Sequence, residues 1–430
     1  MFRNHNVLAR WGYLALLIYP ASYTIAQEQK TGIASSSPHL ERILRIEAWN
    51  RKEPAVRRDP GVYSPKSAIF APSGDRLYVN ALEGMETLVF SVPDFERIGS
   101  IRHRFAARDS ALFLNGETTL FDYKYQNGLP GALNIFNGKP VEMAMSHGGR
   151  YLWVPYYRRS FDSNASSPSA VAVIDTRNLS IVRVLPTGPI PKYVTISPDG
   201  NTAAITHWGD NTVALLDIRG DDPMKFSYLH HIVIESRLNV AGIKGDRDAN
   251  CGYCLRGTVF TPDGKTLLVA RMSGGGIAGI DVSSGQYLGT ATNIVAGPRH
   301  LAIGDSGQTL YVSGNASGRV GRYDLALLIK SIRTSGGTRK PGPGGSSLTV
   351  GPGARTIAIS PDEHYLYVAV NNSSRLVTID LRQWRISEEL PVAPFAVGLA
   401  VSPDGALVVT TSQGRTGQGG GNSIGIYRRR

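Results

Sequence analysis

Basic residues recur at a fixed distance before a turn that is repeated along this sequence. The turn has the form Ser-Pro-Asp-Gly, or a variant of it, and is found seven times. Cations gathered around one opening would attract a carboxylate, a phosphate or an acidic side chain. The alternative is structural, with each basic residue bonding the carbonyl groups of a neighbouring loop. Counting back five residues from the turn serine, or its equivalent, gives Lys66, Val141, Lys192, Arg256, Arg299, Arg355 and Val397, of which five are cations.

A second set of candidate ligand-binding residues follows the second strand of several repeats. It combines aromatic rings with cations, which suits an organic anion or the acidic loop of a partner protein. For His207 and Trp208, packing at the rim is the alternative. The set is Tyr156, Tyr157, Arg158, Arg159, His207, Trp208 and Arg271, with Asn315 and Asn371 beyond.

The two cysteines, in Cys251-Gly-Tyr-Cys254, have the spacing of a redox motif. Redox motifs place the first cysteine at a helix N-terminus, which lowers its pKa, whereas this pair precedes an expected strand. In an exported protein, a disulfide that closes a small loop is the favoured interpretation. Redox activity or binding of a soft metal is the alternative. Because no histidine follows Cys254, covalent attachment of a c-type haem is excluded here.

The elements that must position these residues are short apolar strands in units of about forty residues. Each unit reads as a strand, the tight turn, a second strand, a polar loop and a third strand. Pro-Asp-Gly suits the turn, and Val, Ile, Leu and Tyr suit the strands. Seven turns predict an all-β, seven-bladed β-propeller with a binding site at its channel mouth. The clearest copies span 194–219, 259–282 and 357–382, and degenerate copies span 69–81, 143–157, 301–315 and 399–413.

The last repeat lacks an outer strand. It offers strands only at 397–402, 406–412 and 423–428. An open ring would leave one sheet edge unpaired. We therefore expect the N-terminal segment 40–49, LERILRIEAW, to complete the C-terminal blade and close the ring. The alternative for this segment is a helix, which its Glu and Arg content permits.

The repeats resemble those of the YVTN family, also described as YncE-like. The family consensus reads roughly Arg-Gly-Val-Ala-Val-Ser-Pro-Asp-Gly-Lys-x-Leu-Tyr-Val-Ala-Asn. The resemblance extends over nearly the whole chain after the signal, and it implies the propeller fold. It implies little about function, because the shared residues are mostly turn and core positions and related propellers serve binding, electron transfer and lactone hydrolysis.

Propellers that hydrolyse lactones need either a metal bound by acidic and Asn ligands or an opening that combines Glu, Arg and His. Near the basic positions, this sequence offers Glu142, Arg299 and His300 for the second arrangement. Nucleophile-elbow, zinc-protease, phosphate-loop and dinucleotide patterns do not occur in it. We therefore favour a noncatalytic protein and predict no cofactor, although a divalent metal or a redox cofactor is not excluded.

Residues 1–26 have the pattern of a secretory signal peptide, with Arg3 and Arg10 before an apolar run that ends at Ala26. An uncleaved anchor is the alternative, but Pro20 interrupts a stretch too short for a span of about 20 residues. We expect a flexible leader at 27–38 and a single propeller domain at 39–430, with insertions near 110–137, 235–253 and 333–350. The last insertion is rich in Gly and Pro, which predicts a flexible flap.

The formal net charge of +12 favours anionic partners. No helix-turn-helix, zinc-finger or RNA-binding pattern occurs, so we expect no specific nucleic acid partner. The sequence thus predicts a periplasmic or secreted monomer without a transmembrane span in its mature chain. This protein would bind an anionic small molecule or an acidic protein surface at the channel mouth. The alternatives are a lactonase-like hydrolase at the same mouth and an accessory propeller of a periplasmic redox or cofactor-maturation system.

Overall fold

The structure, a computed structural model, describes residues 39–430 except 50–52, 114–133, 239–244, 305 and 415–420. The expected signal peptide at 1–26 and leader at 27–38, with most of the insertion near 110–137, lie outside the described residues. By its internal contacts the chain divides into Met1–Ser37 and Pro38–Arg430, of which only the second holds described residues. In the part that the structure describes, no helix is long and apolar enough to cross a membrane.

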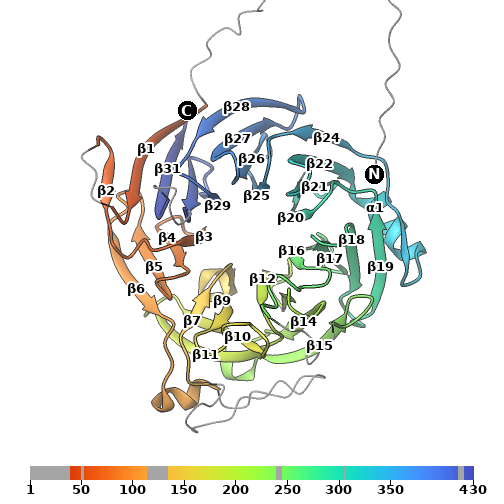
Figure 1. The fold of residues 1–430 in the computed structure, drawn as a ribbon, viewed down its shortest axis with the longest axis horizontal. Helices are drawn as coiled ribbons and strands as arrows, with labels where there is room; N and C mark the ends of the chain where they lie inside the picture. The colour runs from red at the N-terminus through yellow and green to blue at the C-terminus, as the bar shows by residue number, and fades with distance from the viewer. Residues whose placement is uncertain (1–38, 50–52, 114–133, 239–244, 305, 415–420) are drawn as a thin grey trace, which may run out of the picture. The chain divides into compact units, whose positions relative to one another are not determined.

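Seven small sheets form a ring in the described part of Pro38–Arg430, and each runs from an inner strand outward to the rim (Figure 1). This is the seven-bladed, all-β propeller that the repeats predict. Blade 1 holds β3 (Pro65–Phe70), β4 (Arg76–Ala81), β5 (Glu86–Ser91) and β6 (Arg97–Arg102); blade 2 holds β7 (Gly138–Pro140), β8 (Ala144–Ser146), β9 (Tyr151–Arg159), β10 (Ser169–Asp175) and β11 (Ser180–Thr187); blade 3 holds β12 (Pro191–Ile196), β13 (Thr202–His207), β14 (Thr212–Asp217) and β15 (Ser227–Val233).

The remaining four blades follow in chain order around the ring (Figure 1). Blade 4 holds β16 (Leu255–Phe260), β17 (Thr266–Arg271), β18 (Ile277–Asp281), β19 (Tyr287–Thr292) and β23 (Arg339–Pro341); blade 5 holds β20 (Pro298–Gly304), β21 (Thr309–Gly314), β22 (Arg319–Asp324) and β24 (Ser346–Thr349); blade 6 holds β25 (Ala354–Ile359), β26 (Tyr365–Val370), β27 (Arg375–Asp380) and β28 (Arg385–Pro391); blade 7 holds β29 (Ala396–Val401), β30 (Leu407–Ser412), β31 (Ser423–Arg429), β1 (Leu40–Glu47) and β2 (Val56–Arg58). The described helices are α1 (Leu325–Thr334) and the 3-10 turns η1 (Ala107–Phe113), η2 (His147–Gly149) and η3 (Pro223–Lys225).

The apolar core of the described chain consists of seven clusters, and each cluster lies between two neighbouring blades. β10 shows why. All of its residues are buried, because Ala172 and Ile174 pack toward blade 1 whereas Val171 and Val173 pack toward blade 3. Strands covered on both faces read as continuous apolar runs rather than as an alternating pattern.

The side chains of the repeated turn determine its shape. In blade 3, Ser197 donates a hydrogen bond to Asp199 (2.5 Å) and accepts one from the backbone N–H of Thr202 (2.9 Å). Gly200 has a φ of 73°, a backbone conformation that glycine adopts at little cost. The turns of blades 6 and 7 repeat these hydrogen bonds. The turn serine therefore marks the same place in blades 3, 6 and 7, and the residues five positions earlier in these blades are equivalent.

β1 completes blade 7. It pairs antiparallel with β31, from Leu40 opposite Arg429 to Glu47 opposite Ser423. The red and blue ends of the described chain thus lie side by side in one sheet (Figure 1). β2 extends the blade by parallel pairing with β1. This arrangement agrees with the ring closure expected of residues 40–49, and Leu40–Glu47 is a strand rather than a helix.

The insertion near 333–350 is not a free flap, so that expectation was wrong. Its residues form β23, which pairs with β19 of blade 4, and β24, which is the outer strand of blade 5. Arg319 of β22 donates hydrogen bonds to Ser347 (2.8 Å) and Thr349 (2.9 Å). Its Gly and Pro content suggested flexibility, but the backbone of this segment finds partners in two neighbouring sheets.

Replacing Ile46 of β1 by alanine should destabilise the whole ring, because its side chain is fully buried between blades 7 and 1. We expect the free energy of unfolding to fall by about 2–5 kcal/mol. Ile98→Ala on β6 is the matched control, since that side chain is half exposed, and should change stability by no more than about 0.5 kcal/mol. Urea denaturation followed by circular dichroism measures both. Equal effects would contradict the closing role of β1.

Candidate functional site

A cavity of about 330 Å³ lies where the inner strands of five blades begin. Five cations line it, one each from β3, β12, β16, β20 and β25, and they are called the collar here. Val141 of blade 2 also lines the cavity, whereas Val397 of blade 7 does not. Counting from the repeated turn thus brought together residues that lie far apart in the sequence. The collar consists of Lys66, Lys192, Arg256, Arg299 and Arg355.

Hydrogen bonds between blades hold the backbone at these positions. In each case a side-chain hydroxyl of one blade donates to the backbone carbonyl of the equivalent residue in the next blade. These hydrogen bonds use the backbone carbonyl of the residue and leave its side chain free to line the cavity. The pairs are Ser67 with Val141, Thr206 with Arg256, Ser313 with Arg355, Thr356 with Val397, and Thr411 with Lys66.

Two carboxylates lie among the five cations. Glu142, in the loop between β7 and β8, accepts a hydrogen bond from Arg256 (3.0 Å). Asp248 accepts one from the ammonium group of Lys192 (2.8 Å). Asp248 comes from the insertion near 235–253, which therefore contributes directly to the cavity wall. When every cation is protonated, positive charge exceeds negative charge in this cavity.

The other three collar cations have no carboxylate within ion-pair distance among the described residues. Arg299 contacts the sulfur of Met272 (3.2 Å), and Lys66 lies 3.4 Å from the amide oxygen of Gln413. The buried Nε of Arg355 makes no hydrogen bond to any described atom. The exposed fractions of Arg299 and Arg355 are 9% and 6%. Buried charges without partners are costly, so this arrangement favours an added anion.

Loss of water lowers the pKa values of Lys66, Lys192, Arg299 and Arg355. Burial lowers the pKa of Lys192 to about 7, although Asp248 acts to raise it. Burial, and then Arg256, lower the pKa of Arg355 to about 9. Burial, and then the neighbouring arginines, hold the pKa of Lys66 and of Arg299 well below the usual values. A bound anion would stabilise the charged form of each cation that it contacts and would raise the pKa of that cation.

Aromatic rings cover one side of the cavity. The ammonium nitrogen of Lys192 lies 4.0 Å from the ring centre of Tyr157 and 4.8 Å from that of Trp208. The hydroxyl of Tyr157 donates to Asp248 (2.9 Å), and the indole N–H of Trp208 donates to the backbone carbonyl of Asp248 (3.1 Å). Phe395 lines the cavity near Arg355. The wall thus combines flat apolar surfaces with cations.

Of the second predicted set, Tyr157 and Trp208 line this cavity. The other seven residues do not: Tyr156, Arg158, Arg159, His207, Arg271, Asn315 and Asn371. Tyr156 is buried against Phe105 and its hydroxyl bonds to His103 (2.9 Å), because successive side chains of β9 face opposite ways and Tyr157 takes the cavity side. His207 is fully buried in β13 and bonds to Thr212.

Arg271 also lies outside the collar cavity. It is fully buried in blade 4, where it pairs with Glu235 (2.9 Å) and lies 3.9 Å from the ring centre of Tyr253. Glu235 also pairs with Arg339 of β23 (2.9 Å). Arg271 therefore links the insertion near 235–253 to the outer part of blade 4, and it is not a wall of the collar cavity.

The predicted catalytic residues divide between two cavities. Arg299 lines the collar cavity, whereas the next residue along β20, His300, lines a separate cavity of about 300 Å³. His300 is 2.8 Å from the hydroxyl of Tyr193. Burial, and then Arg256 and Arg299, lower the pKa of His300 to about 3. Glu142 lines the cavity of His300 while pairing with Arg256 of the collar, so this ion pair joins the two.

Cys251 and Cys254 form a disulfide in the loop that follows Asp248. Both cysteines are buried, and the neighbouring N–H of Tyr253 donates to Asn211 (2.8 Å). The disulfide therefore belongs to the segment that carries the carboxylate partner of Lys192. Among the described residues, no group of three or more His, Cys, Asp and Glu side chains is arranged to hold a metal ion.

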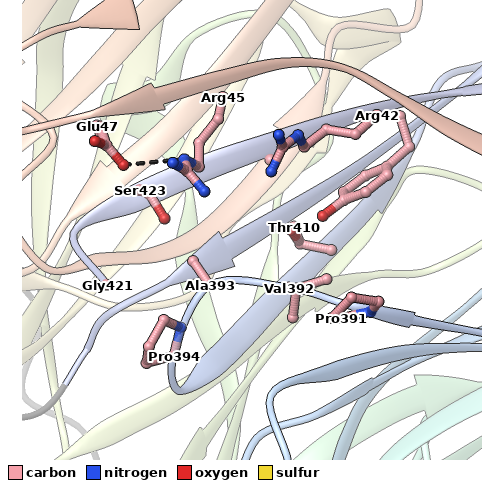
Figure 2. Close-up of a pocket in the computed structure, with 12 residues that line it drawn as sticks. Arg42, Arg45, Glu47, Pro391, Val392, Ala393, Pro394, Thr410, Gly421 and Ser423 are labelled. Atoms are coloured by element: carbon pink, nitrogen blue, oxygen red, sulfur yellow. Dashed lines mark ion pairs between the residues drawn. The ribbon is translucent and has the colours of Figure 1, made fainter. Parts of the chain in front are cut away.

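A third cavity, of about 250 Å³, lies on blade 7 (Figure 2). Arg42 and Arg45 project from β1 on one side of it, and the loop at 391–394 lies on the other. Arg45 pairs with Glu47 (3.0 Å) and with Glu53 (2.7 Å). Because two carboxylates compensate this cation, the cavity on blade 7 is a weaker candidate for an anion than the collar.

Comparison with known proteins gives one family match. A family described as "Lactonase, 7-bladed beta-propeller" matches residues 138–414. No curated protein matches the chain. The resemblance to YVTN repeats is compatible with this family match, because both concern propellers.

Solved structures resemble this chain in fold. Hydrazine synthase of Kuenenia stuttgartiensis has a TM-score of 0.57 and 15% identity, covering 88% of this chain and 99% of that one. A chain of a mitotic checkpoint complex has a TM-score of 0.57 and 11% identity, covering 92% and 97%. The β-propeller domain of Myceliophteria thermophila Cps50 (Swd1) has a TM-score of 0.58 and 13% identity, covering 85% and 96%. At these identities the likeness shows the fold alone.

Lys192 should make the protein more stable as the pH rises from about 7 to 10. Its pKa is about 7 in the folded chain and 10.5 for an unperturbed lysine. Within this window the unfolded chain holds a proton that the folded chain has released, so stability increases with pH. Below about pH 7 both states hold the proton and the trend ends.

Urea denaturation at pH 7, 8 and 9 tests this expectation. Relative to Lys192→Met, the wild-type protein should gain up to about 1.4 kcal/mol per pH unit. Lys265→Met is the matched control, because Lys265 is exposed at a turn and its removal should leave the wild-type trend in place. Parallel profiles for the wild type and Lys192→Met would refute the expectation.

Proposed function

This chain belongs to the seven-bladed β-propeller lactonase family, and we propose that it binds a small organic anion in the collar cavity. The observation that carries the proposal is the incomplete pairing of the collar. Glu142 and Asp248 are the only carboxylates within ion-pair distance of the five collar cations in the described residues. Desolvating a charge costs several kcal/mol when nothing compensates it. A ligand with two or more negative groups would compensate Lys66, Arg299 and Arg355.

The size and walls of the cavity narrow the class of ligand. Its volume of about 330 Å³ is at the small end of the range of about 300–1,000 Å³ typical of ligand sites. Trp208 and Phe395 provide flat apolar surfaces beside the cations. These features favour a compact organic dianion or trianion, with its charged groups on the arginines and its carbon skeleton on the rings. They favour a small molecule over an acidic protein surface.

Lactone hydrolysis is the second candidate function, and the family match favours it. Hydrolysis needs a base that takes a proton from water at neutral pH. His300, with its pKa lowered to about 3, is a weak base there. Glu142 is positioned by its ion pair with Arg256 and is the remaining candidate. Binding without turnover therefore remains our first choice.

Export to the periplasm or the medium stays a prediction, since the segment that would direct it lies outside the described residues. In our proposal the protein acts there as a monomer. Its solute would reach the collar cavity by diffusion and be attracted by the positive charge.

Replacing Arg299 and Arg355 together by glutamine should abolish most anion binding without lowering the melting temperature. Benzene-1,3-disulfonate is a suitable probe, because it carries two anionic groups on a ring and keeps its charge across neutral pH. Each charge-assisted hydrogen bond contributes about 1.5–3 kcal/mol, so each lost arginine should weaken binding about tenfold or more. Isothermal titration calorimetry at low salt measures the affinity.

Arg382→Gln is the matched control, because Arg382 is an exposed arginine outside the cavity. The affinity of this variant for the probe should equal that of the wild type. The double variant should melt at or above the wild-type temperature, since two repelling charges are removed. An unchanged affinity in the double variant would refute the proposed binding site.

A panel of lactones bearing carboxylate or phosphate groups separates the two candidate functions. If the protein only binds, acid release in a pH-stat should be no faster with the wild type than with Glu142→Gln. Turnover by the wild type that is lost in Glu142→Gln would establish hydrolysis and replace the binding-only function. Repeating the assay with added divalent metal ions extends the comparison to a metal-dependent reaction.

A further inference from the structure

Lys192 differs from the other collar cations in the groups that surround its amine. Asp248 lies 2.8 Å from the nitrogen through one carboxylate oxygen. The other oxygen accepts a hydrogen bond from Tyr157 (2.9 Å), so the carboxylate is held from both sides. The rings of Tyr157 and Trp208 cover the amine at 4.0 and 4.8 Å. Amine, carboxylate and phenol therefore form one connected group on the cavity wall.

An uncharged amine is a nucleophile, whereas an ammonium group is not. An exposed lysine, with a pKa near 10.4, is almost entirely protonated at neutral pH. Burial lowers the pKa of Lys192 to about 7, so a large share of this amine is uncharged under the same conditions. The side chain is 12% exposed and lines the collar cavity, which leaves the amine open to a bound molecule.

We propose that Lys192 is a nucleophile that forms an imine with the carbonyl group of an anionic aldehyde or keto acid bound at the collar. The inference rests on the proposed function, since the collar cations would hold the acid group of the carbonyl compound. Arg256 and Arg299 line the same cavity as Lys192 and are placed for that part. The chemical class of ligand is therefore a small carbonyl compound with a carboxylate or phosphate.

The reaction is a condensation without any change of oxidation state. The nitrogen lone pair of Lys192 attacks the carbonyl carbon, a carbon–nitrogen bond forms, and the π electrons move to oxygen. The nitrogen loses a proton and the oxygen gains one, which gives a carbinolamine. Protonation of the hydroxyl and cleavage of the carbon–oxygen bond then release one water, leaving a carbon–nitrogen double bond.

Asp248 is placed to carry the proton in both steps. Its carboxylate contacts the nitrogen, so it can move one proton from nitrogen to oxygen in the first step. In the second step a further proton, taken up from water by the same carboxylate, goes to the hydroxyl that leaves as water, and the nitrogen keeps its last proton in the imine. Tyr157 keeps the carboxylate in this position. The protonated imine is a cation, and the faces of Tyr157 and Trp208 would stabilise it as they do the ammonium group.

Lys66 provides an internal control, because it lines the same cavity and burial also lowers its pKa. Its nearest polar partner is the amide of Gln413 at 3.4 Å, which cannot accept a proton as a carboxylate does. If a lowered pKa were enough, Lys66 would react as well as Lys192. If the carboxylate matters, the adduct should form on Lys192.

Glyoxylate with sodium cyanoborohydride tests the proposal, because reduction converts the imine into a stable carboxymethyl group. Mass spectrometry of the whole protein and of its peptides should show one adduct, on Lys192, that forms ahead of any on Lys66 or Lys265. Asp248→Asn should slow it by about tenfold or more. Excess benzene-1,3-disulfonate should compete with glyoxylate for the cavity and so protect Lys192 from labelling. This competition experiment uses the wild-type protein alone. Lys192→Arg, which keeps a cation in the cavity, should remove the adduct.

Labelling of Lys66 or of exposed lysines at the same rate as Lys192 would overturn the proposal, as would a rate unchanged in a folded Asp248→Asn variant. The wild type titrated with benzene-1,3-disulfonate separates this failure from that of the proposed function. If the probe binds and Lys192 is not labelled, only the imine is refuted. If the probe does not bind, anion binding at the collar is refuted.

Discussion

No blade of this propeller can bury its own sheet, and the rest of the structure depends on that constraint. Each apolar cluster is shared by two neighbours, so every blade needs the one before it and the one after it. β1 completes blade 7 and thereby covers the cluster that blade 7 shares with blade 1. The closed ring brings basic side chains from five blades to the wall of one cavity.

The collar works against the stability that the ring provides. Its cations have lost most of their water, and they repel one another. The hydroxyl-to-carbonyl hydrogen bonds between blades hold the backbone at the collar positions, so repulsion among the side chains is not relieved by a movement of the chain. A site of this kind keeps its geometry when it is empty. The free energy lost to repulsion is then available to strengthen binding of an anion.

The repeated turn explains what the sequence could and could not predict. Because the backbone of Ala71 in blade 1 and of Ser360 in blade 6 makes the same turn hydrogen bond, counting from them placed Lys66 and Arg355 on the same cavity wall. Counting could not tell which face of β9 looks inward, so Tyr156 was expected in a cavity that only Tyr157 reaches. Asp248 lies in an insertion without repeat, and its pairing with Lys192 had no signal in the sequence. Composition likewise could not reveal the sheet partners of β23 and β24.

The pairing of β1 with β31 also determines the order in which the protein can fold. A chain made from its N-terminus exposes β1 long before Ser423–Arg429 have been synthesised. Until then, β1 lacks its antiparallel partner, and Leu40 also lacks the residues of blade 6 that cover it in the finished ring. Among the described strand pairs, β1 and β31 are the farthest apart in the sequence. Contacts between residues that are far apart in the sequence form slowly. During that delay β1 is an unpaired strand edge, a surface prone to aggregation that a molecular chaperone would need to shield.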